Sequence, residues 1–444
     1  MTLRSAVRGG AVLVSLLAAC AAFSQQPAPG AAAPAGAGRG RGAGPQGPRV
    51  VSPEILPDKR VTFRLLAPKA GVVVLNGNWD NGTNIPMAKD DQGIWSVTVG
   101  PLGEQLWGYS FSMDGVKVMD PGNGEYQRDG LRYDNLVMIS GPASDSWEFK
   151  ADVPHGAVQA VWYPSEILKE KGRRMFVYTP PDYMTSNARY PVFYLLHGGG
   201  GDEDAWINMG RANIILDNLI AAGKVKPMIV VMPNGNGNQI VAQGYAYGPT
   251  PRPNAMMAPA PPPVQAAQGG LGMGAGRGAG AAAAPGRGTA GGAAPGGGGR
   301  GMGGQYAGSY PQSLVEEIVP FIDRNYRTIP NKDNRAIAGL SMGGGHVVSA
   351  TNNSPNTFSW IAVWSAGGQD TPEFAAALTK LKEAGVKHYY VAAGTTDMAL
   401  NGARTLYSIA QRVGLNTSWH DSPGMHYWFI WRVFLGDFAS MLFR

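Results

Sequence analysis

Residues 334–346 read NRAIAGLSMGGGH, a short apolar run that ends in a serine set between glycines. Serine and glycine both weaken a β-strand, so the run predicts a buried strand that stops at Gly339-Leu340-Ser341. The glycines can be explained in two ways. They either mark an ordinary loop, or they allow so sharp a backbone turn that Ser341 is exposed as a nucleophile.

A hydrolytic serine needs a base, an acid that orients the base, and N–H donors for the oxyanion. In α/β-hydrolases the acid and then the base follow the serine along the chain. His426 is the predicted base because it lies in a loop after the last expected strand, where it can reach the serine. His420, inside that strand, is its main rival. The other histidines fit less well. His155 and His197 precede the serine, His346 would lie on the helix that follows it, and His388 begins an expected strand.

The predicted acid is Asp397, which follows the apolar run HYYVAAG in the segment TTD. Asp370, after the preceding strand, is the alternative. For the oxyanion, LLHGGGG at 195–201 follows another strong strand, and glycines there let backbone N–H groups approach a ligand closely. We therefore expect the N–H groups of Gly199 and Met342 to be the donor pair.

The pattern of apolar residues differs between two parts of the chain. Residues 51–142 carry short alternating apolar runs separated by turn signals such as Asn76-Gly77 and Asp114-Gly115, which predicts a small β-sandwich. From 143 to 444 near-continuous apolar runs alternate with helical patterns, which is typical of parallel strands covered on both faces. The fold class is therefore α/β, an α/β domain preceded by a small all-β sandwich.

Low-complexity segments carry the basic charge. Residues 25–50 are rich in Ala, Gly and Pro and predict a flexible linker, and 249–305 predict a disordered insertion in the α/β domain. The net charge of +6 includes nine arginines in the leader and these segments, which contain no Asp or Glu. The remaining 28 Lys and Arg face 31 Asp and Glu, a net charge of −3. A nucleic-acid-binding body is therefore not expected.

The start of the chain predicts export. MTLRSAVRGGAVLVSLLAACAAFSQQ has a basic start and a short apolar run, the pattern of a signal peptide at 1–24 and too short for a transmembrane helix. Leu17-Ala18-Ala19-Cys20 resembles a lipoprotein box, which would place a lipid on Cys20. Ordinary cleavage after Ser24 is the other interpretation. Both predict a secreted, periplasmic or envelope-anchored protein.

Several stretches together resemble the bacterial feruloyl esterases of the xylanase Z type and, more broadly, the esterase D and enterochelin-esterase-like group of α/β-hydrolases. They are YPVFYLLHGGGGDEDAW, RANIILDNLIAAGKVKPMIVVMPNG, VEEIVPFIDRNYRT, RAIAGLSMGGG, AAGTTD and GMHYWFIWR. The resemblance covers about 145–444 apart from the insertion. The segment from VTFRLLAPKAGVVVLNGNWD to YSFSMDGVKVMDP resembles the immunoglobulin-like early-set domain found ahead of such esterases.

The resemblance implies that Ser341 is the nucleophile, His426 the base and Asp397 the acid, with the Gly199 and Met342 amides as the oxyanion hole. One departure is Met425, where the family usually has glycine or asparagine before the last histidine. The implied function is a secreted serine carboxylesterase that cleaves feruloyl or acetyl esters on a polysaccharide such as xylan.

Two alternatives stay open at this stage. The first is hydrolysis of a siderophore or another small ester, and the second is a catalytically dead carbohydrate-binding surface protein. No histidine pair at ligand spacing and no phosphate-binding loop is visible in the sequence, so we expect neither a metal nor a cofactor.

Overall fold

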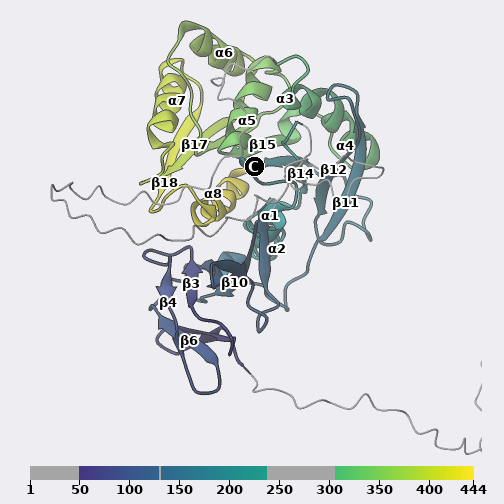
Figure 1. Ribbon diagram of the computed structural model, residues 1–444. Helices are drawn as coiled ribbons and strands as arrows, with labels where there is room; N and C mark the ends of the chain where they lie inside the picture. Colours follow the sequence, from purple (N-terminus) through teal and green to yellow (C-terminus); the bar gives the residue numbers. More distant parts are fainter. Residues whose placement is uncertain (1–49, 130–131, 238–305) are drawn as a thin grey trace, which may run out of the picture. The chain divides into compact units, whose positions relative to one another are not determined.

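The computed structural model describes residues 50–129, 132–237 and 306–444 (Figure 1). The predicted signal peptide with Cys20, the linker up to residue 49 and the insertion at 249–305 lie outside these residues. Val50–Arg444 belongs to one structural unit, so contacts within it can be described. In the described part of the chain, no helix has the length and apolar character needed to cross a bilayer.

The alternating runs of the first part form two antiparallel sheets. One has the strand order β1-β2-β6-β5, and the other has the order β4-β3-β7-β10-β9 with β8 paired to β7. The strands are β1 (Glu54–Ile55), β2 (Val61–Leu66), β3 (Val73–Gly77), β4 (Ile85–Pro86), β5 (Ala88–Lys89), β6 (Ile94–Val99), β7 (Leu106–Met113), β8 (Val116–Val118), β9 (Tyr126–Asp129) and β10 (Arg132–Met138).

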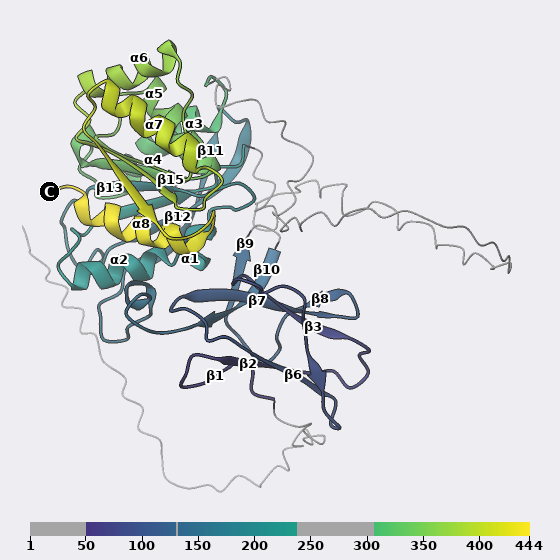
Figure 2. The same ribbon diagram turned by 90° about the vertical axis from the view of Figure 1, so that its left-hand side faces the viewer.

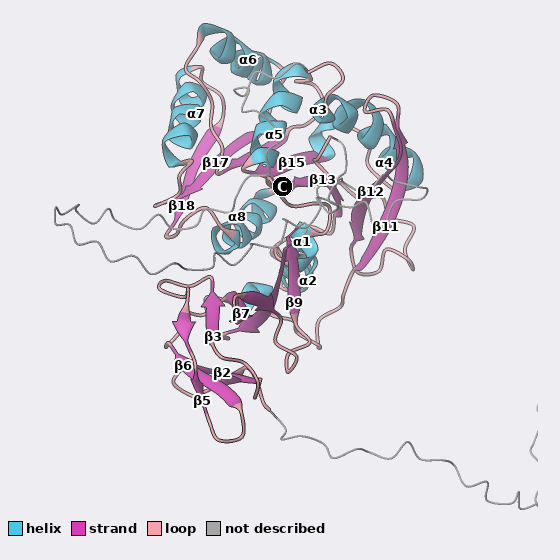
Figure 3. Ribbon diagram, viewed as in Figure 1, coloured by secondary structure: helices cyan, strands magenta, loops and turns pink. Residues whose placement is uncertain are grey.

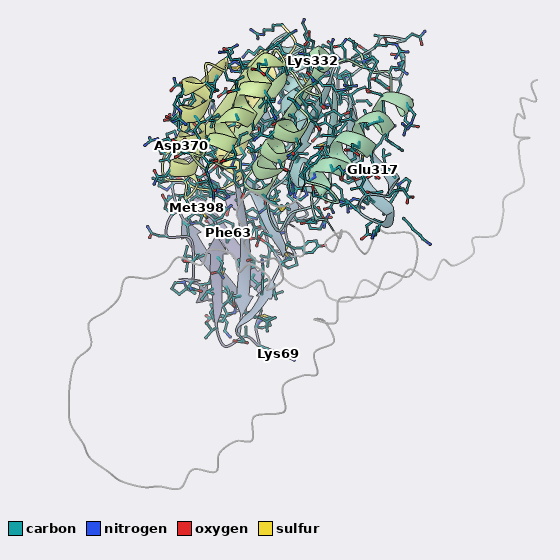
Figure 4. The ribbon with its side chains drawn as sticks, turned by 90° about the horizontal axis from the view of Figure 1, so that it is seen from above. Phe63, Lys69, Glu317, Lys332, Asp370 and Met398 are labelled. Carbon is teal, nitrogen blue, oxygen red and sulfur yellow. The ribbon has the colours of Figure 1, made fainter. Side chains whose placement is uncertain are left out.

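Both sheets bury their apolar faces in one shared core, as the alternation requires. Phe63 of β2, labelled in Figure 4, is fully buried. It packs on Tyr109 of β7, with 4.6 Å between the ring centroids. Trp95 and Trp107 belong to this core, and the partly buried Trp79 packs against it. The first part is therefore a β-sandwich.

The second part is built on an eight-stranded sheet of order β11-β12-β14-β13-β15-β16-β17-β18 (Figure 3). All pairs from β14 to β18 are parallel, whereas β11 and β12 join antiparallel at one edge. The strands are β11 (Ala157–Ser165), β12 (Glu170–Thr179), β13 (Val192–Leu196), β14 (Ile229–Pro233), β15 (Arg335–Leu340), β16 (Trp360–Trp364), β17 (His388–Gly394) and β18 (Thr417–Ser422). The predicted α/β-hydrolase arrangement is confirmed for this part.

Helices cover both faces of this sheet (Figure 2). The core on one face holds α3 to α7, and the core on the other holds α1, α2 and α8. Successive residues of β13 point into opposite cores, which explains why its sequence is apolar throughout. The helices are α1 (Ala205–Asn208), α2 (Ala212–Ala221), α3 (Tyr310–Ser313), α4 (Val319–Asn325), α5 (Met342–Asn353), α6 (Pro372–Glu383), α7 (Leu400–Arg412) and α8 (Trp428–Met441).

Local sequence signals account for several helix ends. Thr371 caps α6 by accepting the Phe374 N–H at 3.2 Å, and Pro372 occupies the first helical position. Gly223 ends the helical stretch of α2 with φ +68°, a conformation that suits glycine. Pro320 lacks a backbone N–H, and a π-helical turn, Leu314–Ile318, separates α3 from α4 just before it.

The register of the parallel strands brings their carboxyl ends to one edge. Gly339 of β15 lies opposite Leu196 of β13, and Leu340 lies opposite Trp364 of β16. The loops that follow these strands therefore begin at the same level of the sheet. In open parallel sheets this edge is where ligands bind.

Candidate active site

Ser341 lies in a sharp turn between β15 and α5, with φ +53° and ψ −117°. A side chain in such a sparsely populated backbone region costs about 1–3 kcal/mol, so the surroundings must impose it. A Cβ at Gly339 would lie 2.3 Å from the Gly343 carbonyl oxygen, and one at Gly343 would lie 2.4 Å from the His197 oxygen. Only glycine fits at both positions, and this backbone contact holds the serine in its strained turn.

The glycine loop after β13 lies directly against this turn. A Cβ at Gly198 would approach the Ser341 Cβ to 3.3 Å, and one at Gly199 would lie 4.0 Å from the Met342 Cβ. Met342 is the first residue of α5, so its N–H has no acceptor within the helix. The two predicted oxyanion donors, Gly199 and Met342, are therefore neighbours.

His197, which the sequence did not single out for this purpose, orients one of these donors. Its Nε2 accepts the Gly235 N–H at 2.8 Å, so the proton is on Nδ1, which donates to the Gly198 carbonyl oxygen at 2.7 Å. The Gly198 carbonyl and the Gly199 N–H share one trans peptide and point in opposite directions. The hydrogen bond thus fixes the direction of the Gly199 N–H. Burial lowers the pKa of His197 and keeps the ring neutral.

Asp397 and His426, the predicted acid and base, contact each other. Asp397 follows β17, His426 follows β18, and the His426 Nδ1 lies 2.8 Å from the Asp397 Oδ1. Burial by itself raises the pKa of Asp397, but the hydrogen bonds from His426 and the Ala399 N–H, with the Ser365 hydroxyl, outweigh it and hold the pKa below its ordinary value. The carboxylate is therefore ionised when it orients the imidazole.

Two further side chains that sequence reasoning missed support this pair. Ser365 follows β16 in the left-handed region, at φ +50°, and is buried. It accepts the Trp431 indole N–H at 2.8 Å, and its hydroxyl contributes to lowering the pKa of Asp397. Trp431 of α8 also packs edge-on against His426, with ring centroids 5.1 Å apart. The only sequence signal for Ser365 is its place directly after a buried strand.

The rival residues are engaged elsewhere. The His420 Nε2 is 2.9 Å from the Ser418 hydroxyl, and its ring stacks on Tyr390. Asp370 is exposed and forms an ion pair with Arg412 (Figure 4). Within the described residues, no hydrogen bond joins Ser341 to His426. Such catalytic hydrogen bonds are often long in a free enzyme and tighten when substrate binds.

A pocket of about 740 Å³ opens at Ser341. One wall is a single face of α5, formed by Ser341, Met342, Gly345, His346 and Ser349. Eight residues of helix rise about 12 Å, so the pocket extends well beyond the nucleophile.

The other walls of this pocket are mostly small or apolar. They include Pro311 on one side and Gly368, Met398 and Gly402 on the other. Met425 is exposed and is not among the described residues that line the pocket, so the sequence departure before His426 does not alter this wall. In the described part of the chain, no cluster of three or more His, Cys, Asp or Glu is arranged to hold a metal ion.

A family model described as "Putative esterase" matches residues 165–256 and 298–434, more than half of the chain. The chain belongs to this esterase family. The matched segments contain Ser341, Asp397, His426 and the glycine loop, so the family resemblance and the site geometry concern the same residues.

Among curated relatives of this esterase, the endo-1,4-beta-xylanase/feruloyl esterase of Xylanibacter ruminicola is 28% identical over 389 residues, which cover 86% of this chain and 44% of the relative. Esterase Rv1288 of Mycobacterium tuberculosis is 28% identical over 198 residues, 40% of this chain and 28% of that protein. The chain thus spans less than half the length of either relative.

Among solved structures, the enterobactin esterase FES from Shigella flexneri superposes with a TM-score of 0.54 at 16% identity, covering 86% of this chain and 92% of that one. A likeness at this level of identity concerns the fold alone.

The assignment of the acid can be tested with two isosteric variants. We expect Asp397→Asn to lower kcat by about 10³–10⁴-fold, because an amide disturbs the tautomer and orientation of His426. Asp370→Asn is the matched control and should keep kcat within about twofold, since an exposed ion pair contributes little. Steady-state hydrolysis of p-nitrophenyl acetate measures both. Comparable losses in the two variants would contradict the assignment.

The half-buried His346 makes stability depend on pH. Its Nδ1 is buried without a hydrogen-bond partner among the described residues, and burial lowers its pKa to about 3. The unfolded chain therefore binds this proton at higher pH than the folded one, and stability falls as the pH drops from about 6.5 towards about 3, by up to about 1.4 kcal/mol per pH unit. In His346→Gln this contribution is absent. Urea unfolding at several pH values should show that the free energy of unfolding falls less at acid pH in the variant than in the wild type. An equal fall in both proteins would contradict this prediction.

Proposed function

We propose that the protein is a serine carboxylesterase with Ser341 as nucleophile, His426 as general base and Asp397 as the acid that orients it. The observation that carries the proposal is the 2.8 Å contact between His426 and Asp397 at the sheet edge where Ser341 sits in a strained turn. The loops that carry Ser341, Asp397 and His426 all begin at that edge, which a turn of purely structural purpose does not require.

In the proposed reaction, the His426 Nε2 takes the proton of the Ser341 hydroxyl while its oxygen attacks the ester carbonyl carbon. The N–H groups of Gly199 and Met342 donate to the oxyanion that forms. When the tetrahedral intermediate collapses, the ester C–O bond breaks and His426 returns the proton to the leaving alcohol. Water then attacks the acyl-enzyme by the same route, releasing the acid and restoring the serine.

We propose a feruloyl ester on a polysaccharide such as xylan as the substrate, with acetyl esters as the smaller alternative. The length of the pocket supports the aromatic acid, because an acetyl group would fill only the part next to Ser341, whereas a hydroxycinnamoyl group would extend along α5 towards Ser349. The name of the Xylanibacter ruminicola relative, which includes feruloyl esterase, agrees with this choice.

The alternatives have less support. An anionic catecholate siderophore calls for cationic side chains, and none of the described residues that line the pocket is Lys or Arg. The likeness to the enterobactin esterase is one of fold. A dead binding protein would have no need for the two contacts, from the His426 ring and from the Ala399 N–H, that converge on the Asp397 Oδ1.

We also propose that the protein is exported, on the pattern of the leader at 1–24, with either cleavage after Ser24 or a lipid on Cys20. The proposed domain boundaries are 51–142 for an immunoglobulin-like early-set sandwich and 143–444 for the esterase domain.

A substrate panel with Ser341→Ala tests the nucleophile. The wild type should release acid from methyl ferulate, p-nitrophenyl acetate and feruloylated xylan, and the variant should lose at least about 10⁴-fold in kcat, because no other hydroxyl replaces the nucleophile. If only the acetyl ester is cleaved, the feruloyl assignment is wrong. If wild type and variant are equally inactive on every ester, the esterase proposal is wrong.

Filling the far part of the pocket tests the acyl group. We expect Ser349→Phe to lower kcat/KM for methyl ferulate at least about 10-fold and to change that for p-nitrophenyl acetate less than about threefold, because only the longer acyl group reaches this position. Asn353→Phe, which adds the same side chain to an exposed position of α5, is the control and should affect neither ester. Equal losses on both esters in Ser349→Phe would contradict the placement of the acyl group along α5.

A further inference from the structure

The glycine loop that carries the Gly199 N–H is anchored by hydrogen bonds at two points. At its start His197 holds the Gly198 carbonyl, and in its middle the Asn236 side-chain amide donates to the Gly201 carbonyl at 2.8 Å. Glycine-rich backbone has more conformational freedom than any other, so the direction of the Gly199 N–H depends on these anchors. The far end of the loop runs into three consecutive acids, Asp202, Glu203 and Asp204.

The carboxylates of this acidic run are shielded from water, so cationic partners are needed to stabilise their charge. Asp202 and Glu203 are essentially fully buried. Glu203 is paired within the α/β domain, by Arg174 of β12 and by the Asn234 amide at 2.8 Å. A buried carboxylate without a partner is costly enough to rearrange the segment that carries it. The cation for Asp202 is therefore part of what keeps the loop in place.

That cation comes from the β-sandwich. Arg128 of β9 is 5% exposed and makes a bidentate contact with Asp202, Nη1 to Oδ2 at 2.5 Å and Nη2 to Oδ1 at 3.0 Å. Its Nη2 also lies 3.1 Å from the Asp204 Oδ2. A planar guanidinium that holds two carboxylates fixes their positions as well as their charge.

The sandwich also reaches the loop that carries the base. Gln105 of the sandwich, which is buried, lies close enough to Tyr427, the neighbour of His426, to influence the pKa of its hydroxyl. The first part of the chain thus contacts both loops that flank Ser341, at separate points.

We propose that the β-sandwich is a positioning element of the active site, in which Arg128 acts through Asp202 to hold the oxyanion loop in its working conformation. Arg128 is a positioning residue and does not itself touch the substrate. The inference rests on the proposed esterase function, and it makes the sandwich necessary for turnover whether or not this domain also binds carbohydrate.

The test uses the full chain and p-nitrophenyl acetate, so that it does not depend on the feruloyl assignment. We expect Arg128→Ala to lower kcat about 10–100-fold with KM changed less than about threefold, because a displaced oxyanion donor weakens the transition state more than the bound ester. Affinity for a boronic acid, which forms a tetrahedral adduct on the serine, should fall in parallel. Arg64→Ala, which breaks an ion pair with Glu54 inside the sandwich, is the control and should leave both unchanged.

Two further variants keep the test decisive if Arg128→Ala folds poorly. Arg128→Lys keeps the charge without the bidentate contact and should give an intermediate kcat. In Arg128→Ala/Asp202→Asn the neutral amide can stay buried and still accept the Asp204 N–H, so the double variant should be more active than Arg128→Ala.

The inference is overturned if Arg128→Ala and Arg128→Lys keep wild-type kcat and boronic acid affinity, or if they raise KM alone. A wild type that hydrolyses no ester contradicts the proposed function and this inference with it. An active wild type with an equally active Arg128→Ala contradicts this inference only.

Discussion

The contact between the backbones of Gly339 and Gly343 is the constraint on which the site depends. The two segments approach more closely than any side chain would permit, and the end of β13 closes on Gly343 from the other side. Three backbone segments thus meet without side chains between them. This contact forces Ser341 into its positive φ and at the same time brings the glycine loop against the start of α5. The same backbone contact therefore determines the positions of the nucleophile and of the oxyanion donors.

The parallel register of the sheet then determines which other residues lie at this edge. Each strand from β13 to β18 ends at the same edge, and the residues just beyond those ends are His197, Ser341, Ser365, Asp397 and His426. Short loops after the strands limit where these side chains can lie, so residues up to 229 positions apart in the chain come to the same edge of the sheet. The esterase family membership and this geometry lead to the same residues.

Much of this arrangement was predictable from sequence, for a physical reason. Apolar runs give the strands, glycine marks the close approaches, and chain order gives the positions of Asp397 and His426. The contributions of Ser365, Trp431 and Arg128 were not predictable, because each acts through a partner far along the chain. Trp431 and Ser365 are 66 positions apart, and Arg128 and Asp202 are 74 apart. The chain order of serine, acid and base excludes His197 as the base, because it precedes the serine. That order does not apply to a residue that orients a peptide.

The place of Trp431 on α8 has a consequence for how the protein is made. A chain is synthesised from its N-terminal end, and segments fold as they emerge. Ser341 and its turn therefore exist before α8 does, yet the Trp431 indole that holds Ser365 beside Asp397 arrives only with that helix. Until α8 docks, Ser365 lacks the indole N–H that it accepts. The surroundings of Asp397 and His426 are therefore complete only when the last helix of the described sheet domain is in place.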